Sequence, residues 1–284
     1  MKIVYWAVGL VLVLLVLVYL ISVFGESSFN QNVADDIDKL IADVNIEQVD
    51  KVTEDDLEGL PVPVKRWLEF SQVVGKEKIK TVRLKQVGSM RTKPGQKGMD
   101  TKAEQYFNTV DPSFVWKARV NMMPMLYFAG EDKYYDGQGK MLIKVLSLFP
   151  VVDAEGKEMN QGTLTRYLGE IIWFPTAALS EYIEWEEIDA NTARATMSYK
   201  GTSGSAVFNF EDSGKVVSFE CKRYYNSDEG YRLEDYYAPV WNYQEFSGIK
   251  IPTQAKAIWR LESGDYEYYD MEITEIDYNI KDKY

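Results

Sequence analysis

The feature that most constrains this chain is a change in hydrophobic period near residue 78. Beyond that point, several segments place an apolar residue at every second position, as β-strands with one face in water do. Turn sequences rich in Gly, Asp and Pro separate these segments, and such short turns predict an antiparallel meander. The clearest sets are Val82, Leu84, Gly88 and Met90; Phe114, Trp116, Ala118 and Val120; Ala193, Ala195, Met197 and Tyr199; and Ala255, Ala257, Trp259 and Leu261.

Helical patterns precede the sheet and interrupt it once. Apolar residues repeat at helical spacing over residues 33–44, and a short helix is expected to begin at Pro63 and to end at Gly75. A further apolar face between Leu164 and Trp173 predicts a helical insertion near residues 161–180. A sheet with one apolar face needs a cover. We therefore expect an α+β domain, with a large antiparallel sheet covered on one face by helices.

The N-terminus has the composition of a membrane anchor. From Ile3 to Gly25 there is no charged residue, and a helix of that length spans roughly the 30 Å of a bilayer core. A cleaved signal peptide is the alternative, but its apolar region is shorter and Val23-Phe24-Gly25 is a poor cleavage site. Lys2 before the run and Glu26 after it favour a cytoplasmic N-terminus. The prediction is a single-pass anchor over residues 1–25 in the cytoplasmic membrane, with the domain outside.

The chain is acidic, and the acid is concentrated early. Its formal net charge is −12, which argues against nucleic acid as a partner. Residues 26–59 carry many Asp and Glu but few Lys, and we interpret them as an acidic helical stalk that stands off the membrane. An acidic docking site is the alternative interpretation of the same segment. The remaining residues, 60–284, are enough for one large domain with a buried core.

Two absences exclude whole classes of chemistry. The chain contains no histidine, which removes Ser-His-Asp catalysis and His-ligated metals. Cys221 is its single cysteine, so an intramolecular disulfide and a thiolate metal cluster are excluded. Because Cys221 lies in an alternating segment, we expect it to be a small buried hydrophobe. The sequence predicts neither a metal nor a cofactor.

One strand carries a charge on its apolar face. Alternation in residues 215–225 places Arg223 on the same side as Phe219 and Cys221, and a buried arginine needs an anionic partner. Glu170 in the helical insertion is a candidate partner, and Arg166 one turn earlier would complete an ion-pair cluster. The favoured interpretation is a salt bridge that joins helix to sheet. A ligand-binding or catalytic role is the alternative.

Other polar and apolar features remain open. Gln86 also falls on an apolar strand face, where it satisfies a backbone group or orients a polar head group in a cavity. The segment Met122–Phe128 is apolar on both faces and rich in flexible thioethers. Core filling is the favoured interpretation of that segment, with a ligand rim and a membrane-facing lip as alternatives.

Four segments and three single residues resemble an uncharacterised prokaryotic family of unknown function. The likeness runs from about Leu60 to Asn279. The resemblance implies a curved sheet similar to the half-barrels of lipoprotein carriers and other apolar-ligand binders, but no known activity. Its most specific part is Arg166–Pro175, and it also includes Leu60–Leu68, Phe114–Ala118, Asp136–Met141, Ile251, Pro252 and Trp259.

The leading functional hypothesis is non-catalytic binding of an apolar or amphipathic, lipid-like molecule between sheet and helices. An envelope scaffold that binds another protein through an exposed patch far from Arg223 is the first alternative. A carboxylate-dependent hydrolase, with Glu170 as one of two acids in a cleft, is the second. The leading hypothesis assigns the apolar wall to Trp116, Met125, Trp173 and Trp259, and the polar end to Gln86, Arg166, Glu170 and Arg223.

Overall fold

The computed structural model describes residues 2–227 and 230–284, although the side chains of several residues among the first 17 lie outside that description. The described residues form thirteen strands in one antiparallel sheet. The strands are β1 (Thr81–Met90), β2 (Met99–Asn108), β3 (Ser113–Met123), β4 (Leu126–Tyr135), β5 (Gln138–Val145), β6 (Phe149–Glu155), β7 (Ile183–Asp189), β8 (Thr192–Tyr199), β9 (Thr202–Phe210), β10 (Val216–Ser227), β11 (Gly230–Phe246), β12 (Ile249–Leu261) and β13 (Gly264–Tyr278).

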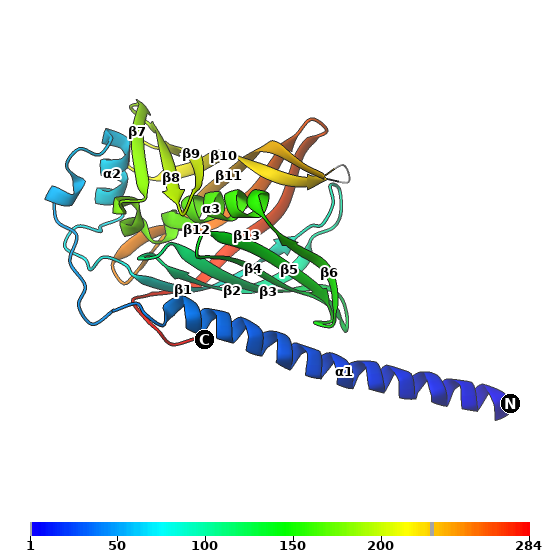
Figure 1. Ribbon diagram of the computed structural model, residues 1–284. Coiled ribbons are helices and arrows are strands. Elements are labelled where there is room, and N and C mark those ends of the chain that lie inside the picture. The colour runs from blue at the N-terminus through cyan, green and yellow to red at the C-terminus, as the bar shows by residue number, and fades with distance from the viewer. Residues whose placement is uncertain (1, 228–229) are drawn as a thin grey trace.

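Strand order explains the half-barrel shape. Neighbours in the sheet are mostly neighbours in the chain, and β13 joins the two halves by pairing with β1, which gives the order β6-β5-β4-β3-β2-β1-β13-β12-β11-β10-β9-β8-β7. Register shifts interrupt several pairs, including β1 with β13 at Lys85/Gln86, and such bulges increase local twist. The sheet therefore curls on itself (Figure 1). The predicted meander and the curved half-barrel implied by the family resemblance are confirmed.

The chain between the two edge strands β6 and β7 lies in the hollow of the sheet. It contains α3 (Lys157–Glu170) and the 3₁₀ turns η2 (Ile171–Trp173) and η3 (Pro175–Leu179). In Figure 1, α3 lies inside the curved sheet. Its contact with β10 is so close that a Cβ on Gly169 would lie 2.3 Å from the Phe219 ring. The insertion is thus helical and crosses the sheet as expected, but α3 begins earlier than the predicted Leu164.

The concave side holds the main core. Val82, Leu84, Ala193, Ala195 and Ala257 are all buried in it, on the alternation that the sequence indicates. Trp67 of α2 (Val62–Phe70) packs into the same core. Helix α2 and η1 (Asp55–Leu57) lie at the end of the domain remote from the chain's N-terminus (Figure 1). This short helix stops before the predicted Gly75, because Gln72 adopts a left-handed φ of 61°.

The convex side has its own helix, which corrects the expectation of helices on one face. Helix α1 (Lys2–Ile41) has 40 residues and is about 60 Å long. Its last turns bury Val33, Ile37 and Leu40 against Tyr106 and Val115 of β2 and β3. At Tyr106 and Val115 the outer faces of these strands are apolar, so a helix can cover them there. Residues 29–41 are therefore packed on the sheet and are not part of a free stalk.

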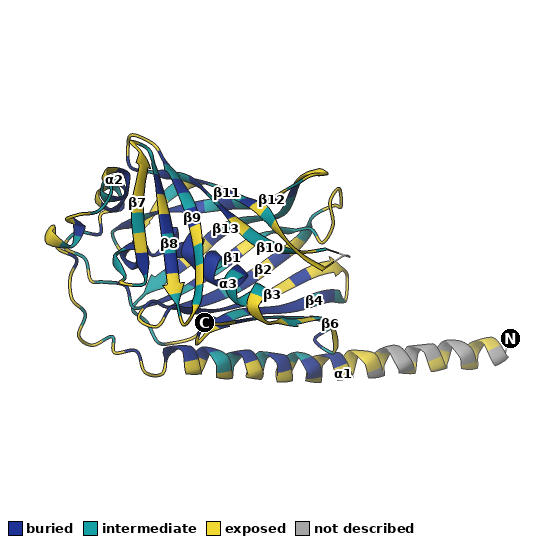
Figure 2. Cartoon of the chain, turned by 45° about the horizontal axis from the view of Figure 1, so that its top comes forward, coloured by how far each residue is buried: buried dark blue, intermediate teal, exposed yellow. Residues whose placement is uncertain are grey.

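The N-terminal half of α1 extends away from the domain (Figures 1 and 2). Within the described residues, no helix combines the length and the apolar character that a membrane crossing needs. The anchor predicted over residues 1–25 falls partly on side chains outside the described residues. Among those that are described, exposed apolar side chains include Val4, Trp6, Leu10, Val13, Val16, Leu20 and Phe24.

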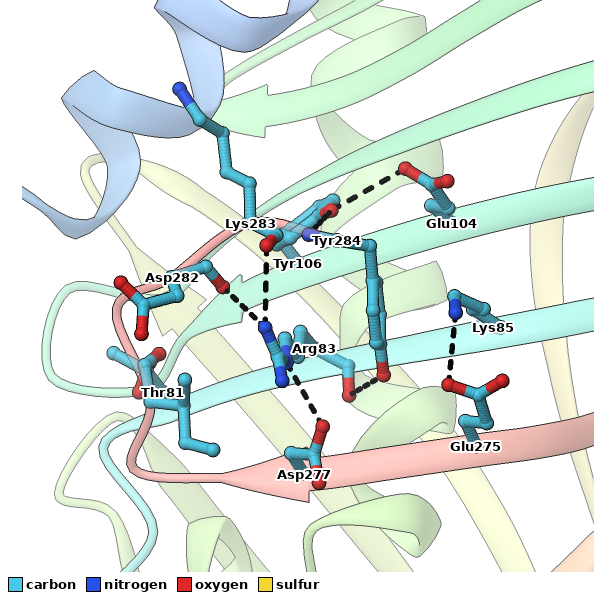
Figure 3. Close-up of polar contacts among 11 residues, drawn as sticks. Thr81, Arg83, Lys85, Glu104, Tyr106, Glu275, Asp277, Asp282, Lys283 and Tyr284 are labelled. Atoms are coloured by element: carbon cyan, nitrogen blue, oxygen red, sulfur yellow. Dashed lines mark hydrogen bonds and ion pairs between the residues drawn. The ribbon is translucent and has the colours of Figure 1, made fainter.

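Polar contacts secure the C-terminal segment between the sheet and α1. Arg83 Nε donates to Asp277 at 2.9 Å, and its Nη1 donates to the carbonyl of Asp282 at 3.0 Å (Figure 3). The Tyr284 ring lies under the Arg83 guanidinium at 4.4 Å, and Lys283 reaches Asp38 of α1 at 2.6 Å. The segment thus links β1, β13 and α1 on the convex side.

Candidate functional site

A large cavity lies between the concave side of the sheet and α3. Its volume is about 920 Å³, within the roughly 300–1,000 Å³ of small-molecule sites. Most of its wall is apolar, with Val120, Phe128, Ile143, Val240 and Met271 among the lining residues. The cavity exists because the sheet curves around one helix that is too slender to fill the hollow.

The structure brings six of the eight predicted site residues to this cavity. They come from three separate parts of the chain, the first hairpins, α3 with η2, and the last strands. Because the curved sheet places its two halves opposite each other, residues nearly 150 positions apart face one space. These lining residues are Trp116, Arg166, Glu170, Trp173, Arg223 and Trp259.

Arg166 and two carboxylates form the polar floor. Arg166 Nε donates to Glu170 Oε1 at 2.8 Å, across one turn of α3, and its Nη1 donates to Asp132 Oδ2 on β4. The guanidinium lies over the rings of Phe114 at 4.9 Å and Trp116 at 5.1 Å. The expected bridge between helix and sheet is therefore present, with Asp132 as the sheet partner.

A hydrogen-bond chain continues from this ion pair into the sheet. Gln105 Nε2 donates to Glu170 Oε2 at 2.8 Å, and Gln86 Nε2 donates to Gln105 Oε1 at 3.4 Å. Trp116 Nε1 then donates to Gln86 Oε1 at 3.0 Å. Gln86 is buried and does not line the cavity, so its contact is with the indole of Trp116 and not with a bound head group.

Burial and ion pairing shift the pKa values of the groups in this cluster in opposite directions. Burial raises the pKa of Asp132 and of Glu170, and the nearby Arg166 opposes that rise in both. Burial also disfavours the charge of Arg166, but Glu170 and Asp132 outweigh it, so the pKa of Arg166 is raised. The guanidinium is therefore the fixed charge around which the two acids are held.

Arg223 differs from Arg166 in having no carboxylate at ion-pair distance among the described residues. The expected pairing with Glu170 is wrong, because Arg166 occupies that carboxylate. The Arg223 guanidinium lies over the Tyr236 ring at 4.7 Å and 5.7 Å from the Trp259 ring, and its buried Nε has no hydrogen-bond partner among the residues that the structure describes. Burial disfavours its charge, yet Tyr268 and Tyr236 raise its pKa, so it is a cation.

Met125 is outside the cavity, contrary to the prediction. It lies in the β3–β4 turn with φ 66° and is 77% exposed. Core filling by Met122–Phe128 is wrong for its first half, because Met122 and Met123 are exposed as well. The segment is apolar on both sides because it passes through a hairpin turn. Within it, Tyr127 is buried near α1, whereas Phe128 lines the cavity.

Sequence reasoning missed Asp132 and Gln105. Both lie on strand faces where the residues on either side of them are apolar. In β2, Ala103 and Phe107 share the face of Gln105, and in β4, Gly130 and Tyr134 share that of Asp132. The same signal, a polar residue in the apolar register, had identified Gln86 and Arg223. Applied to every strand, it would have found both.

The cavity opens at one end of the half-barrel. Its lining includes Met90–Lys93 at the end of β1 and Tyr224–Asn226 at the end of β10. These hairpin ends lie on the side toward which the N-terminal half of α1 extends (Figure 1). The opposite end carries α2 and η1. The mouth and the apolar part of α1 therefore belong to the same end of the molecule.

Comparisons with known proteins give a family and a distant structural neighbour. A search of curated proteins finds no match. The crystal structure of a LolA superfamily protein from Nitrosomonas europaea superposes with a TM-score of 0.41 and 10% sequence identity, covering 77% of this chain and 94% of that chain. A family model described as a family of unknown function, DUF6544, matches residues 50–271. Since this match spans most of the chain and includes the whole cavity wall, the protein belongs to the DUF6544 family.

Proposed function

We propose that this protein is a membrane-anchored, extracytoplasmic binding protein that holds an amphipathic, lipid-like molecule in the cavity without catalysis. The observation that carries the proposal is a cavity of about 920 Å³ with a largely apolar wall and a cation, Arg223, that has no carboxylate at ion-pair distance among the described residues. Apolar walls favour an acyl or other hydrocarbon portion, because its burial contributes about 25 cal/mol per Å². The chemical class of the ligand's polar end follows from the hydrogen-bonding groups that the cavity presents.

Arg223 is the candidate receptor for the polar end. Its guanidinium presents donors and no acceptor, so a carboxylate, phosphate or sulfate group is the complementary partner. The Tyr236 and Trp259 rings hold the guanidinium in place and supply part of the apolar wall. We therefore propose an anionic head group at Arg223, with the hydrocarbon portion along Trp116 and Trp173.

The acids of the floor are better suited to structure than to hydrolysis. A carboxylate-dependent hydrolase needs one acid to donate a proton and another to act as base or nucleophile. Asp132 and Glu170 instead share the guanidinium of Arg166. That arrangement fixes α3 to β4 and holds both carboxylates in ion pairs, which supports a positioning role.

Anchoring through α1 is part of the proposal. Its first 25 residues contain one charged side chain, Lys2, and the described side chains from Val4 to Phe24 are largely exposed apolar groups. Exposed apolar surface of this extent favours a lipid environment. An N-terminus inside and a domain outside remain the proposed orientation. A further envelope protein as partner stays a prediction.

The test is native mass spectrometry of the full chain released from lipid nanodiscs, followed by solvent extraction of bound material. We expect a lipid-sized adduct that is lost, or reduced several-fold, in Arg223→Ala. The matched control is Arg260→Ala, because Arg260 lies on the next strand but one, is exposed, and pairs with Glu220 at 2.9 Å.

Two results would contradict the proposal. The first is an adduct-free wild-type protein that takes up no added fatty acid or phospholipid. The second is equal adduct occupancy in Arg223→Ala and wild type, which would exclude Arg223 as the receptor. Circular dichroism of both variants establishes that the domain is folded in each case.

A further inference from the structure

The hairpins next to α1 carry exposed apolar tips at the mouth of the cavity. Met123 and Met125 in the β3–β4 turn are 61% and 77% exposed, and Phe149 at the start of β6 is 64% exposed. The two hairpins are neighbours, because Leu146 N donates to the Tyr127 carbonyl at 3.0 Å. Large apolar side chains gathered on one rim indicate a contact surface.

This rim meets α1 where the apolar segment of the helix ends. Leu148, in the turn before β6, lies so close that a Cβ on Gly25 would be 2.4 Å from its Cδ2 atom. One residue later, Glu26 accepts a hydrogen bond from Arg119 Nη1 at 2.8 Å and another from the Tyr127 hydroxyl at 3.2 Å. The first charged residue after the apolar run is thus fixed beside the rim.

We propose that this lip inserts into the interfacial region of the bilayer that α1 enters. The lip consists of Met122, Met123, Met125, Phe149 and Val151. The proposal rests on the anchoring proposed above, since the helix sets the height of the lip above the lipid. Because Gly25 closes the apolar segment and contacts the β5–β6 turn, a spanning α1 brings the lip to the membrane surface.

The charge of the neighbouring β1–β2 loop also supports a lipid bilayer as the partner of the lip. The β1–β2 loop contains Lys93 and Lys97, besides Arg91, which pairs with Glu267 of β13 at 3.0 Å. It has no acidic residue from 91 to 97, although the chain as a whole has a net charge of −12. This loop neighbours the β3–β4 turn, because β2 pairs with β3. Basic residues next to exposed apolar ones suit an anionic lipid surface. Acidic Glu262 in the β12–β13 turn and Asp265 at the start of β13 lie on the other side of β1 in the sheet order.

The position of the lip also determines how a ligand enters the cavity. Val120, Phe128 and Val145, which line the cavity, lie on the same two hairpins as the lip. With the lip in the interfacial region, a lipid passes from the bilayer to the cavity along continuous apolar surface and does not cross water. The desolvation cost of exposing an acyl chain is then avoided.

The experiment places an environment-sensitive dye at the lip of the full chain. Met125→Cys is labelled with NBD and reconstituted into vesicles of phosphatidylcholine with or without phosphatidylglycerol. Cys221 stays native, because it is buried and burial raises the pKa of its thiol to about 12. The matched control is Ser213→Cys, in the exposed β9–β10 turn at the opposite end of the strands.

We expect a blue shift and a several-fold rise of NBD emission at position 125 and no change at position 213. The response at 125 should be larger with phosphatidylglycerol. Flotation of the same vesicles separates the two proposals. A chain that floats with unchanged emission at 125 overturns the lip and leaves the anchor standing, whereas a chain that does not float overturns both.

A second variant tests the role of the lip in ligand entry. Met125→Glu combined with Phe149→Glu should slow transfer of a fluorescent lipid from vesicles several-fold, while the occupancy at equilibrium stays unchanged. The control is Ile188→Glu, an exposed apolar position on the remote strand β7. Equal transfer rates in the lip variant and the control would contradict the proposal.

Discussion

At the residue scale, two arginines in one cavity have opposite surroundings. Arg166 is held by Glu170 and Asp132, so its donors are used within the protein. Arg223 faces aromatic rings and has no carboxylate at ion-pair distance among the described residues. An ion pair positions elements, whereas a cation over aromatic rings keeps donors for an incoming anion. Binding and stability should therefore respond differently to the two.

Arg223→Gln should weaken binding of an anionic amphiphile by roughly 10- to 100-fold, because a hydrogen bond to a charged group contributes about 1.5–3 kcal/mol. Its melting temperature should remain near that of wild type, since no internal ion pair is lost. Titration with a fluorescent fatty acid measures the first quantity and calorimetry the second.

Arg166→Gln should have the opposite effect to Arg223→Gln, on stability and not mainly on binding. It should lower the free energy of unfolding by about 3–5 kcal/mol, because Asp132 and Glu170 would be buried carboxylates without the opposite charge that now pairs with them. Urea denaturation checks this. A loss no greater than that of Arg223→Gln would show that the floor cluster is not structural.

Cys221 gives a residue-scale probe of folding. Burial raises the pKa of its thiol to about 12, so the reactive thiolate is nearly absent at neutral pH. We expect no reaction with a thiol reagent in the folded protein and one equivalent after denaturation. Rapid labelling of the native protein would contradict the burial of this side chain.

At the element scale, two helices stabilise the sheet from opposite sides. Helix α3 lies in the hollow, tied by the Arg166 cluster and by the close approach of Gly169 to Phe219. Helix α1 lies on the convex side, where an apolar contact and ion pairs such as Arg119 with Glu26 hold it. Of these two helices, only α3 lines the cavity. Helix α1 extends from the convex side toward the end at which the cavity opens (Figure 1).

Gly169→Ala should lower the free energy of unfolding by about 1–3 kcal/mol, because the added Cβ would lie 2.3 Å from the Phe219 ring and force α3 away from β10. Gly162→Ala is the control, since a Cβ there meets no atom within 4 Å. Equal stabilities of the two variants would show that the contact relaxes without cost.

The packing of α1 should depend on pH through Glu131. Burial and the nearby Asp36 of α1 raise the pKa of Glu131 from its usual 4.5 to about 7. The folded state then binds the proton more tightly than the unfolded chain. This contribution is fully present below pH 4.5 and is lost as pH rises to about 7. Glu131→Gln should therefore be more stable than wild type at pH 8 by about 2–3 kcal/mol and similar at pH 4.

Denaturation of both proteins at the two pH values measures that difference. Lys133 also faces the pair and lowers the pKa of Glu131, so the shift is a balance between its attraction and burial. Glu275→Gln, on the exposed surface, is the control. A stability difference between wild type and Glu131→Gln that does not change with pH would contradict the assignment.

At the scale of the whole molecule, the closure of the sheet by β1 and β13 creates the site. That pairing joins the N-terminal hairpins, which carry Trp116 and Asp132, to the last strands, which carry Trp259. The mouth, the lip and the apolar part of α1 then share one end (Figure 1). A ligand in the cavity touches both halves, so it should stabilise the molecule as one unit.

A bound amphiphile at about 100 times its Kd should raise the free energy of unfolding by roughly 2.7 kcal/mol. The melting temperature should rise with ligand concentration in wild type and rise less in Arg223→Gln, where a 10- to 100-fold weaker Kd leaves about 0.4–1.4 kcal/mol of stabilisation at the same concentration. A melting temperature independent of ligand in both proteins would exclude binding to the folded state.

The sequence by itself determined the antiparallel meander, several of its strands and the order of helices and strands, because hydrophobic period and turn chemistry are local properties. Its motifs also carried the resemblance to the family. It also identified the polar residues Gln86 and Arg223 in apolar register. It did not determine which charges pair between elements, since Asp132 reaches Arg166 only where α3 packs against β4. Nor did it determine that Met125 leaves the core, that α1 covers the convex face, or that a cavity remains. Those depend on the curvature of the sheet, a property of thirteen paired strands acting together and of no single segment.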